Sequence, residues 1–196
     1  MQYFLDTAET IPDGVGFARF GPVHLAWLAG GCLFALAACL LYRCLGPAGR
    51  ALARRGFAAA LLADEAFKTV LLLAGGNYLP KYLPLHLCSI NILLIAVHAL
   101  HPGKTLDNFL YVLCLPTALA ALLFPTWTAL PPANFMHIHS FTVHILLVVY
   151  PLMLTAGGDI RPDVRRLPRC LGLLAALAAV ALGANRDGLF RKGDYL

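Results

Sequence analysis

The sequence predicts an all-α fold: a single domain over residues 1–196, built from about six transmembrane helices, with the N-terminus outside. Hydrophobic residues make up 60% of the chain and charged residues only 13%, and the mean hydropathy is +0.74. A soluble domain of this length rarely has such a composition. One spanning helix needs about 20 predominantly apolar residues, so six spans and short loops fill the chain. No second domain is expected.

Six apolar runs separated by Gly- and Pro-containing breaks define the expected helices. They cover residues 24–42, 52–74, 83–100, 108–124, 135–155 and 167–184. The first 21 residues carry Asp6, Glu9 and Asp13 and lack the basic start of a secretory signal peptide. We expect them to form an interfacial lead-in to the first span.

The basic residues predict the orientation. The formal net charge is +5, but these residues lie in loops between the apolar runs, which favours membrane topology over nucleic-acid binding. Nine lie on one side: Arg43, Arg50, Arg54, Arg55, Lys104, Arg161, Arg165, Arg166 and Arg169. Five lie on the other: Arg19, Lys81, Arg186, Arg191 and Lys192. The positive-inside rule therefore places the N-terminus outside. High Ala, Leu and Arg usage favours a bacterial inner membrane.

The six cysteines are expected to be free thiols. Cys32, Cys39, Cys88 and Cys114 lie within the apolar runs, which is not the distribution of an extracellular disulfide framework. Most of them are expected to pack as small apolar side chains.

Charged residues interrupt the run 52–74 near its middle. Asp64 and Lys68 are four residues apart, and Glu65 and Lys68 are three apart. One ammonium can neutralise one carboxylate, so the second carboxylate needs another partner. Charges within a membrane are costly and mark either a structural ion pair or a site for substrate or protons.

The run 83–100 carries a polar stripe. At 3.6 residues per turn, Cys88, Asn91, Ile95 and His98 share one face, whereas His86 projects from another side. A thiol near a helix N-terminus gains thiolate character, and a neighbouring histidine can activate it further.

The run 135–155 opens with an unusual density of histidine. His137 and His144 are seven residues apart and share a face, whereas His139 points elsewhere. Because the runs 83–100 and 135–155 begin on the same side of the membrane, we expect Cys88 and His144 to approach each other at similar depth.

Several interpretations of these residues remain open. Cys88 can be a nucleophile with His144 as its general base, while Asn91 and the other histidines orient the base or stabilise an oxyanion. His86, Cys88, His137 and His139 can instead bind a metal or haem, although no pair has a specific ligand spacing. The same residues can be inter-helix hydrogen-bonding groups. A transporter or sensor would use Asp64, Glu65 and Lys68 as its polar centre.

Three segments carry a resemblance to a known family. They are Leu83-Pro84-Leu85-His86-Leu87-Cys88-Ser89, the Phe-Gly-Pro-Val-His lead-in that ends at His24, and the histidine-rich start of the run 135–155. Together they resemble the YwaF-like bacterial membrane proteins, which are related to the transmembrane protein 164 family. The resemblance extends from Phe20 through the sixth run.

The resemblance implies a lipid acyltransferase. A cysteine takes an acyl chain from a phospholipid and passes it to a lysophospholipid, including ether-linked acceptors in the animal members. It implies Cys88 as the nucleophile and His144 as the catalytic histidine, with membrane phospholipids and lysophospholipids as partners. No cofactor is expected for this reaction.

Overall fold

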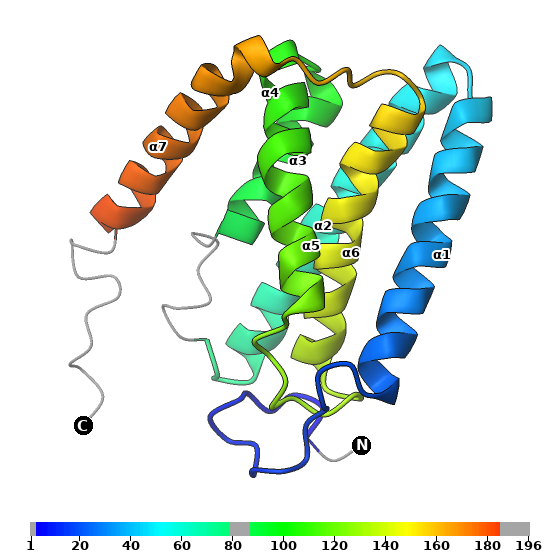
Figure 1. The fold of residues 1–196 in the computed structure, drawn as a ribbon. Coiled ribbons are helices and arrows are strands. Elements are labelled where there is room, and N and C mark those ends of the chain that lie inside the picture. Colours follow the sequence, from blue (N-terminus) through cyan, green and yellow to red (C-terminus); the bar gives the residue numbers. More distant parts are fainter. Residues whose placement is uncertain (1–2, 79–86, 185–196) are drawn as a thin grey trace.

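The computed structural model describes residues 3–78 and 87–184, and the described part is entirely helical. In chain order the elements are α1 (Pro22–Cys44), α2 (Pro47–Ala74), α3 (Leu87–Leu100), α4 (Lys104–Phe109), the π-helical turn η2 (Leu110–Cys114), α5 (Leu115–Leu123), α6 (Phe135–Ala156), the 3-10 turn η3 (Val164–Arg166) and α7 (Leu167–Ala184). Because α4, η2 and α5 follow one another without a break, the chain forms six helices (Figure 1). The predicted all-α fold with six helices is confirmed.

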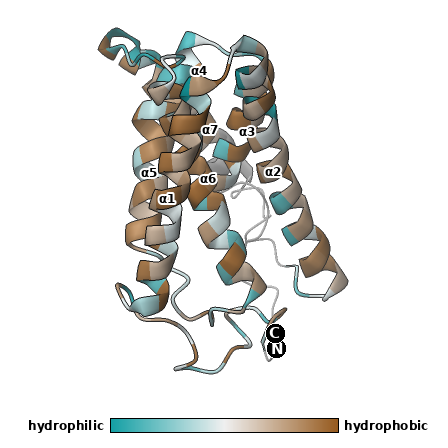
Figure 2. Ribbon diagram, turned by 90° about the vertical axis from the view of Figure 1, so that its right-hand side faces the viewer, coloured by the Kyte–Doolittle hydropathy of each residue, from teal (hydrophilic) through white to brown (hydrophobic). Residues whose placement is uncertain are grey.

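Three of these helices are long and apolar enough to cross a membrane: α1, the continuous helix Lys104–Leu123, and α6. The described part of α3 is apolar but shorter. On α1 the outward leucines are well exposed, for example Leu33 at 69% and Leu41 at 68%, as expected for side chains that face lipid. In Figure 2 the apolar colour dominates the helices, whereas polar bands interrupt α2. These features identify an integral membrane protein.

Helix α2 begins five residues before the predicted start at residue 52. Pro47 lies in its first turn, where a missing N–H costs no hydrogen bond. The prediction followed the apolar run, but the helix also contains Arg50 and Arg54, which lie at its polar end. A helix can extend beyond the hydrocarbon, so hydropathy alone places its start too late.

Helix α6 lies at the centre of the bundle and packs against α1, α2, α3 and α5. Its buried side chains therefore form much of the core. In contrast, α7 leans away from the other helices and packs mainly against α4 (Figure 1). The largest fully buried side chains of the core are Tyr42, Tyr150, Phe109, Phe141, Leu61, Ile92, Ile95 and Leu147.

The N-terminal segment before α1 covers one end of the bundle, where α6 begins. The Asn134 side chain caps α6 by accepting from the amides of Met136 and His137, and its own amide group donates to the carbonyls of Tyr3 and Asp6. The lead-in expected from the sequence is therefore a folded cover.

Two further contacts hold this cover and the start of α1. The Phe17 amide donates to the Thr128 carbonyl at 2.9 Å. The buried imidazole of His24 accepts from the Phe20 amide and lies 2.7 Å from the Leu122 carbonyl. His24, which belongs to the family-like lead-in, thus ties the start of α1 to the end of α5.

Candidate functional site

A thiol of α3 and an imidazole of α6 lie in contact where the two helices pack together. Cys88 lies in the first described turn of α3, and its Sγ is 3.1 Å from Nε2 of His144. His144 is 9% exposed, and Cys88 is half-buried. Helices α3 and α6 therefore bring together the two residues that the sequence expected at similar depth.

The backbone of α6 fixes the orientation of His144. Its Nδ1 lies 2.7 Å from the carbonyl oxygen of Ser140, one turn earlier on the same helix. Because a carbonyl only accepts, Nδ1 carries the proton and Nε2 is left with a lone pair toward Cys88. A neutral imidazole in this tautomer can accept the thiol proton, as a general base does.

Trp127, in the loop between α5 and α6, covers His144. The two rings stack with centroids 5.1 Å apart and an interplanar angle of 21°. The indole also contacts the edge of Phe141. The Nε1 of Trp127 is buried without a hydrogen-bond partner among the described residues. An unpaired buried donor beside a thiol–imidazole pair is unusual, and an acceptor on a ligand would satisfy it.

Sequence reasoning did not identify Trp127. It lies in a loop 17 residues before His144, outside every apolar run, so no helical periodicity connects the two. Its neighbour Pro125 and the later Pro131 mark a loop but do not indicate which side chain turns inward.

Asn91 supplies a second unpaired polar atom on the stripe of α3. Its side chain is 2% exposed, and its Oδ1 has no hydrogen-bond partner in the part of the chain that the structure describes. Ile95 and His98, further along the stripe, are buried as well. His98 interacts with Tyr150 and Asp107 at the other end of α3, so it does not belong to the Cys88 site.

The charged residues of α2 form a compact cluster with α6. Lys68 Nζ lies 2.5 Å from Glu65 Oε1, and His139 Nδ1 lies 2.7 Å from Asp64 Oδ2, although not at a hydrogen-bonding angle. His139 Nε2 is 3.8 Å from the second oxygen of Glu65. Asp64, the carboxylate that Lys68 does not neutralise, thus has the additional partner that the sequence required. That partner is His139, the histidine expected to point away from His144.

His137 has a different environment from the one its helical position suggested. Its Nε2 accepts a hydrogen bond from Trp27 Nε1 at 3.0 Å, and its Nδ1 lies 3.3 Å from the Leu130 carbonyl. It packs edge-on against Phe17 at the cover. Both ring nitrogens are engaged in holding α1, α6 and the loop together, and no contact between His137 and Cys88 is recorded.

The three candidate metal ligands that the structure describes, Cys88, His137 and His139, are not arranged as a metal site. His86 lies outside the described residues. Among the residues described, no group of three or more His, Cys, Asp or Glu side chains is arranged to hold a metal ion. The thiol–imidazole pair is therefore the arrangement at this site with recognisable chemistry.

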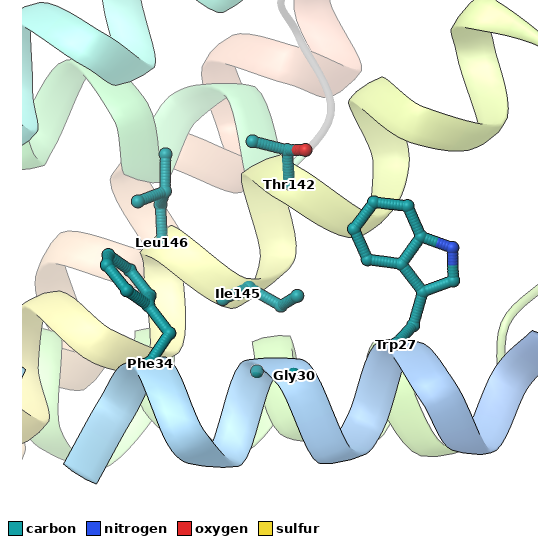
Figure 3. A pocket seen from close by; sticks show the side chains of 7 residues that line it. Trp27, Gly30, Phe34, Thr142, Ile145 and Leu146 are labelled. Carbon is teal, nitrogen blue, oxygen red and sulfur yellow. The ribbon is translucent and has the colours of Figure 1, made fainter. Parts of the chain in front are cut away.

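Apolar cavities lie beside α6, near the histidine-bearing segment. One, of about 310 Å³, is walled by Trp27, Gly30 and Phe34 of α1 and by Thr142, Ile145 and Leu146 of α6 (Figure 3). Another, of about 250 Å³, lies between α1, α5 and α6 and is lined almost entirely by aliphatic side chains. Cavities of this size and polarity can accommodate parts of hydrocarbon chains.

Comparison with known proteins gives one family. The model of the TMEM164 family matches residues 19–188, which include every described residue of the Cys88 site. No match was found among curated proteins or among solved structures. The expected relationship to the YwaF-like proteins is not confirmed by these comparisons. Since the match extends over most of the sequence, the chain belongs to the TMEM164 family.

Proposed function

We propose that this protein is a membrane-embedded, cysteine-dependent acyltransferase that moves acyl chains between phospholipids. The observation that carries the proposal is the 3.1 Å contact between Cys88 Sγ and His144 Nε2, with His144 Nδ1 held by the Ser140 carbonyl. Cys88 as nucleophile, His144 as base and the Ser140 carbonyl as the group that orients the base are the three components that covalent acyl transfer needs. The family resemblance of the sequence implies the same residues.

The reaction proceeds in two balanced steps. His144 takes the thiol proton, and the Cys88 sulfur attacks an ester carbonyl of the donor phospholipid. The C–S bond forms, the ester C–O bond breaks, and His144 returns the proton to the departing lysophospholipid oxygen. In the second step His144 deprotonates the hydroxyl of an acceptor lysophospholipid, whose oxygen attacks the thioester. The new ester forms, the C–S bond breaks, and the proton restores the thiol.

Trp127 provides a donor for the oxyanion that each step creates. Its buried Nε1–H lacks a partner in the described residues and belongs to the ring stacked on His144. A preorganised donor stabilises developing negative charge more than it stabilises the ground-state carbonyl. Asn91, one turn after Cys88 and also carrying an unpaired atom, is a second group that can orient the substrate.

The surroundings favour a lipid as the acyl donor. The cavity of Figure 3 includes Thr142 and Ile145, which flank His144 along α6 within two residues. Because its lining is apolar and the helices face hydrocarbon, an acyl chain can enter laterally from the bilayer. The same dry environment protects a thioester from water. No group beyond these side chains is required for the chemistry.

The distribution of basic residues supports an external site. The loop containing Trp127 and the N-terminal cover lie at the end of the bundle where α6 begins, opposite the nine basic residues, and Cys88 lies in the first described turn of α3, on that side of His98. By the positive-inside rule, we place the N-terminus and the Cys88 site on the outer face of a bacterial inner membrane.

Acyl transfer by the purified protein tests the proposal. The protein is reconstituted with a phospholipid that carries an isotopically labelled acyl chain and with an unlabelled lysophospholipid, and products are followed by mass spectrometry. Cys88→Ser and His144→Asn should each abolish most of the transfer, and a thiol-reactive probe should label Cys88 faster when His144 is present.

Cys44→Ser is the matched control, since Cys44 is an exposed thiol at the end of α1 and lines neither apolar cavity. It should transfer acyl chains at the wild-type rate. Wild-type activity in a folded Cys88→Ser protein would show that the proposed nucleophile is wrong.

A further inference from the structure

The end of the bundle opposite the N-terminal cover holds a second polar cluster, centred on Asp159 just after α6. Arg50 Nη1 lies 2.7 Å from Asp159 Oδ1, and Arg54 Nη1 lies 3.3 Å from Oδ2. The Tyr42 hydroxyl donates to the same Oδ2 at 2.6 Å. One carboxylate therefore holds two arginines of α2 close together beside the end of α1.

Asp159 accepts hydrogen bonds from only one N–H-bearing nitrogen of each arginine, Nη1 of Arg50 and Nη1 of Arg54. Arg54 Nε is buried and has no partner in the described chain, and neither Arg50 Nη2 nor Arg54 Nη2 makes a hydrogen bond with a described residue. An unsatisfied guanidinium donor in a protected position is costly unless something binds it. The cluster is thus left with hydrogen-bonding capacity for an anion.

Two adjoining cavities open next to the unused donors. The larger, of about 500 Å³, is lined by Leu45, Pro47, Arg50, Arg54, Pro102 and Asp159. The smaller, of about 150 Å³, shares three of these residues and adds His98, Lys104 and Asp107 among its lining. We refer to the two together as the basic cavity.

The charge of the basic cavity favours an anion. Three of its lining side chains are cationic and two are carboxylates, and both carboxylates already have partners. Asp159 binds the arginines, and Asp107 Oδ1 lies 2.8 Å from His98 Nε2. Lys104 is exposed, and no partner for its ammonium is recorded among the described residues. An incoming anion therefore meets Lys104 and the free edges of the arginines.

The position of the basic cavity matches that of a lipid headgroup. It lies where α1 ends and where α2 and α4 begin, so it is at the level of the membrane surface. Its rim includes the apolar side chains of Leu45, Pro47 and Ile160, which can lie against a glycerol backbone and the first carbons of acyl chains. Basic pockets between helices at this level bind the phosphates of anionic lipids.

We propose that the basic cavity binds the phosphate group of an anionic phospholipid. Arg54 and Lys104 donate to the phosphate oxygens, and Asp159 holds the arginines in position. The lipid bound here is separate from any acyl donor at Cys88, because Cys88 lies in the first described turn of α3 whereas His98, which lines the basic cavity, lies near the other end of that helix. The inference does not depend on the acyltransferase proposal.

Lipid binding by the delipidated full-length protein in detergent tests this inference. Native mass spectrometry and thermal unfolding are measured with phosphatidylglycerol, with phosphatidylcholine and with inorganic phosphate. Arg54→Gln and Lys104→Gln should each weaken phosphatidylglycerol binding at least about tenfold, the effect of losing one charge-assisted hydrogen bond. Arg55→Gln, which removes an exposed neighbouring charge of α2 that does not line the cavity, should leave binding within about twofold of wild type.

Three outcomes would overturn the inference. One is equal binding of phosphatidylglycerol by the Lys104→Gln and Arg55→Gln variants. Another is equal affinity for phosphatidylcholine and phosphatidylglycerol, because only the anionic lipid should exploit the excess positive charge. The third is equal stabilisation by inorganic phosphate at matched concentration, which would assign the cavity to free phosphate. If Arg54→Gln does not fold, the test depends on Lys104→Gln alone. The Lys104 side chain has no recorded partner among the described residues, so its replacement should not disturb folding.

Discussion

The indole of Trp127 lies flat against the imidazole of His144, with ring centroids 5.1 Å apart, while its own N–H remains unpaired among the described residues. The contact therefore combines apolar stacking, which holds the base, with a hydrogen-bond donor that the folded protein leaves unused. These two roles can be separated by substitution.

Trp127→Phe keeps an aromatic ring against His144 but removes the donor. If that N–H stabilises the oxyanion, the rate constant of acyl transfer should fall about 10²–10³-fold, while Cys88 labelling by a thiol probe stays near wild type. A Trp127→Phe enzyme with wild-type turnover would leave the indole only a packing role.

Lys68→Met tests the charged cluster of α2. Lys68 is 6% exposed, and the substitution leaves the partly buried Glu65, whose side chain is 15% exposed, without its cation. Removing one partner of a fully buried ion pair costs about 3–5 kcal/mol, so a somewhat smaller loss of stability is expected here. The melting temperature in detergent should fall clearly, and the double variant Glu65→Gln/Lys68→Met should recover much of the loss. Equal melting temperatures for Lys68→Met and wild type would contradict the ion-pair role.

Gly16→Ala tests how tightly the N-terminal cover packs. A Cβ at this position would lie 2.0 Å from the backbone oxygen of Thr128, which cannot move without disturbing the loop. We expect a loss of about 1–3 kcal/mol of stability and faster proteolysis of the first 15 residues. Gly56→Ala, in open space on α2, should leave proteolysis of the first 15 residues unchanged and should not lower stability, because Ala favours a helix more than Gly does. Unchanged proteolysis of Gly16→Ala would show that the cover is not held there.

Gly30→Leu tests the cavity of Figure 3 as an acyl-chain site. A Cβ at this glycine would meet nothing within 4 Å, and Gly30 lines the cavity, so a larger side chain has space there and folding should be preserved. Transfer of long acyl chains should fall about tenfold relative to short ones, because the added volume excludes several methylenes. Gly56→Leu is the matched control on an open helical surface. A wild-type chain-length preference in Gly30→Leu would place the acyl chain elsewhere.

Hydropathy was sufficient to predict the six helices, because long apolar runs have one stable form in a bilayer. The pairing of Cys88 with His144 also followed from the sequence, since the two apolar runs were expected to begin on the same side of the membrane and to place both side chains at similar depth. Lys68 with Glu65 is a local pair on one helix, and such pairs follow from spacing alone.

The contacts that sequence reasoning missed join distant segments. Arg54 and Asp159 are 105 residues apart, and Trp127 reaches His144 from a loop without periodicity. His137 was expected to accompany His144 on one face of α6, but the indole N–H of Trp27 binds it instead. Helical position fixes the direction of a side chain, whereas its partner depends on how neighbouring helices pack.

The N-terminal cover is bound by residues that are synthesised much later than the cover itself. Its anchors, the Asn134 side chain and the Phe135 amide, are synthesised more than 100 residues after the segment that they bind. During translation the first residues therefore lack these two partners until the start of α6 has been synthesised. His144 and Trp127 appear equally late, so a nascent chain that already exposes Cys88 holds an inactive thiol until α6 has been inserted. Under the proposed mechanism, Cys88 therefore lacks its general base until the bundle is complete.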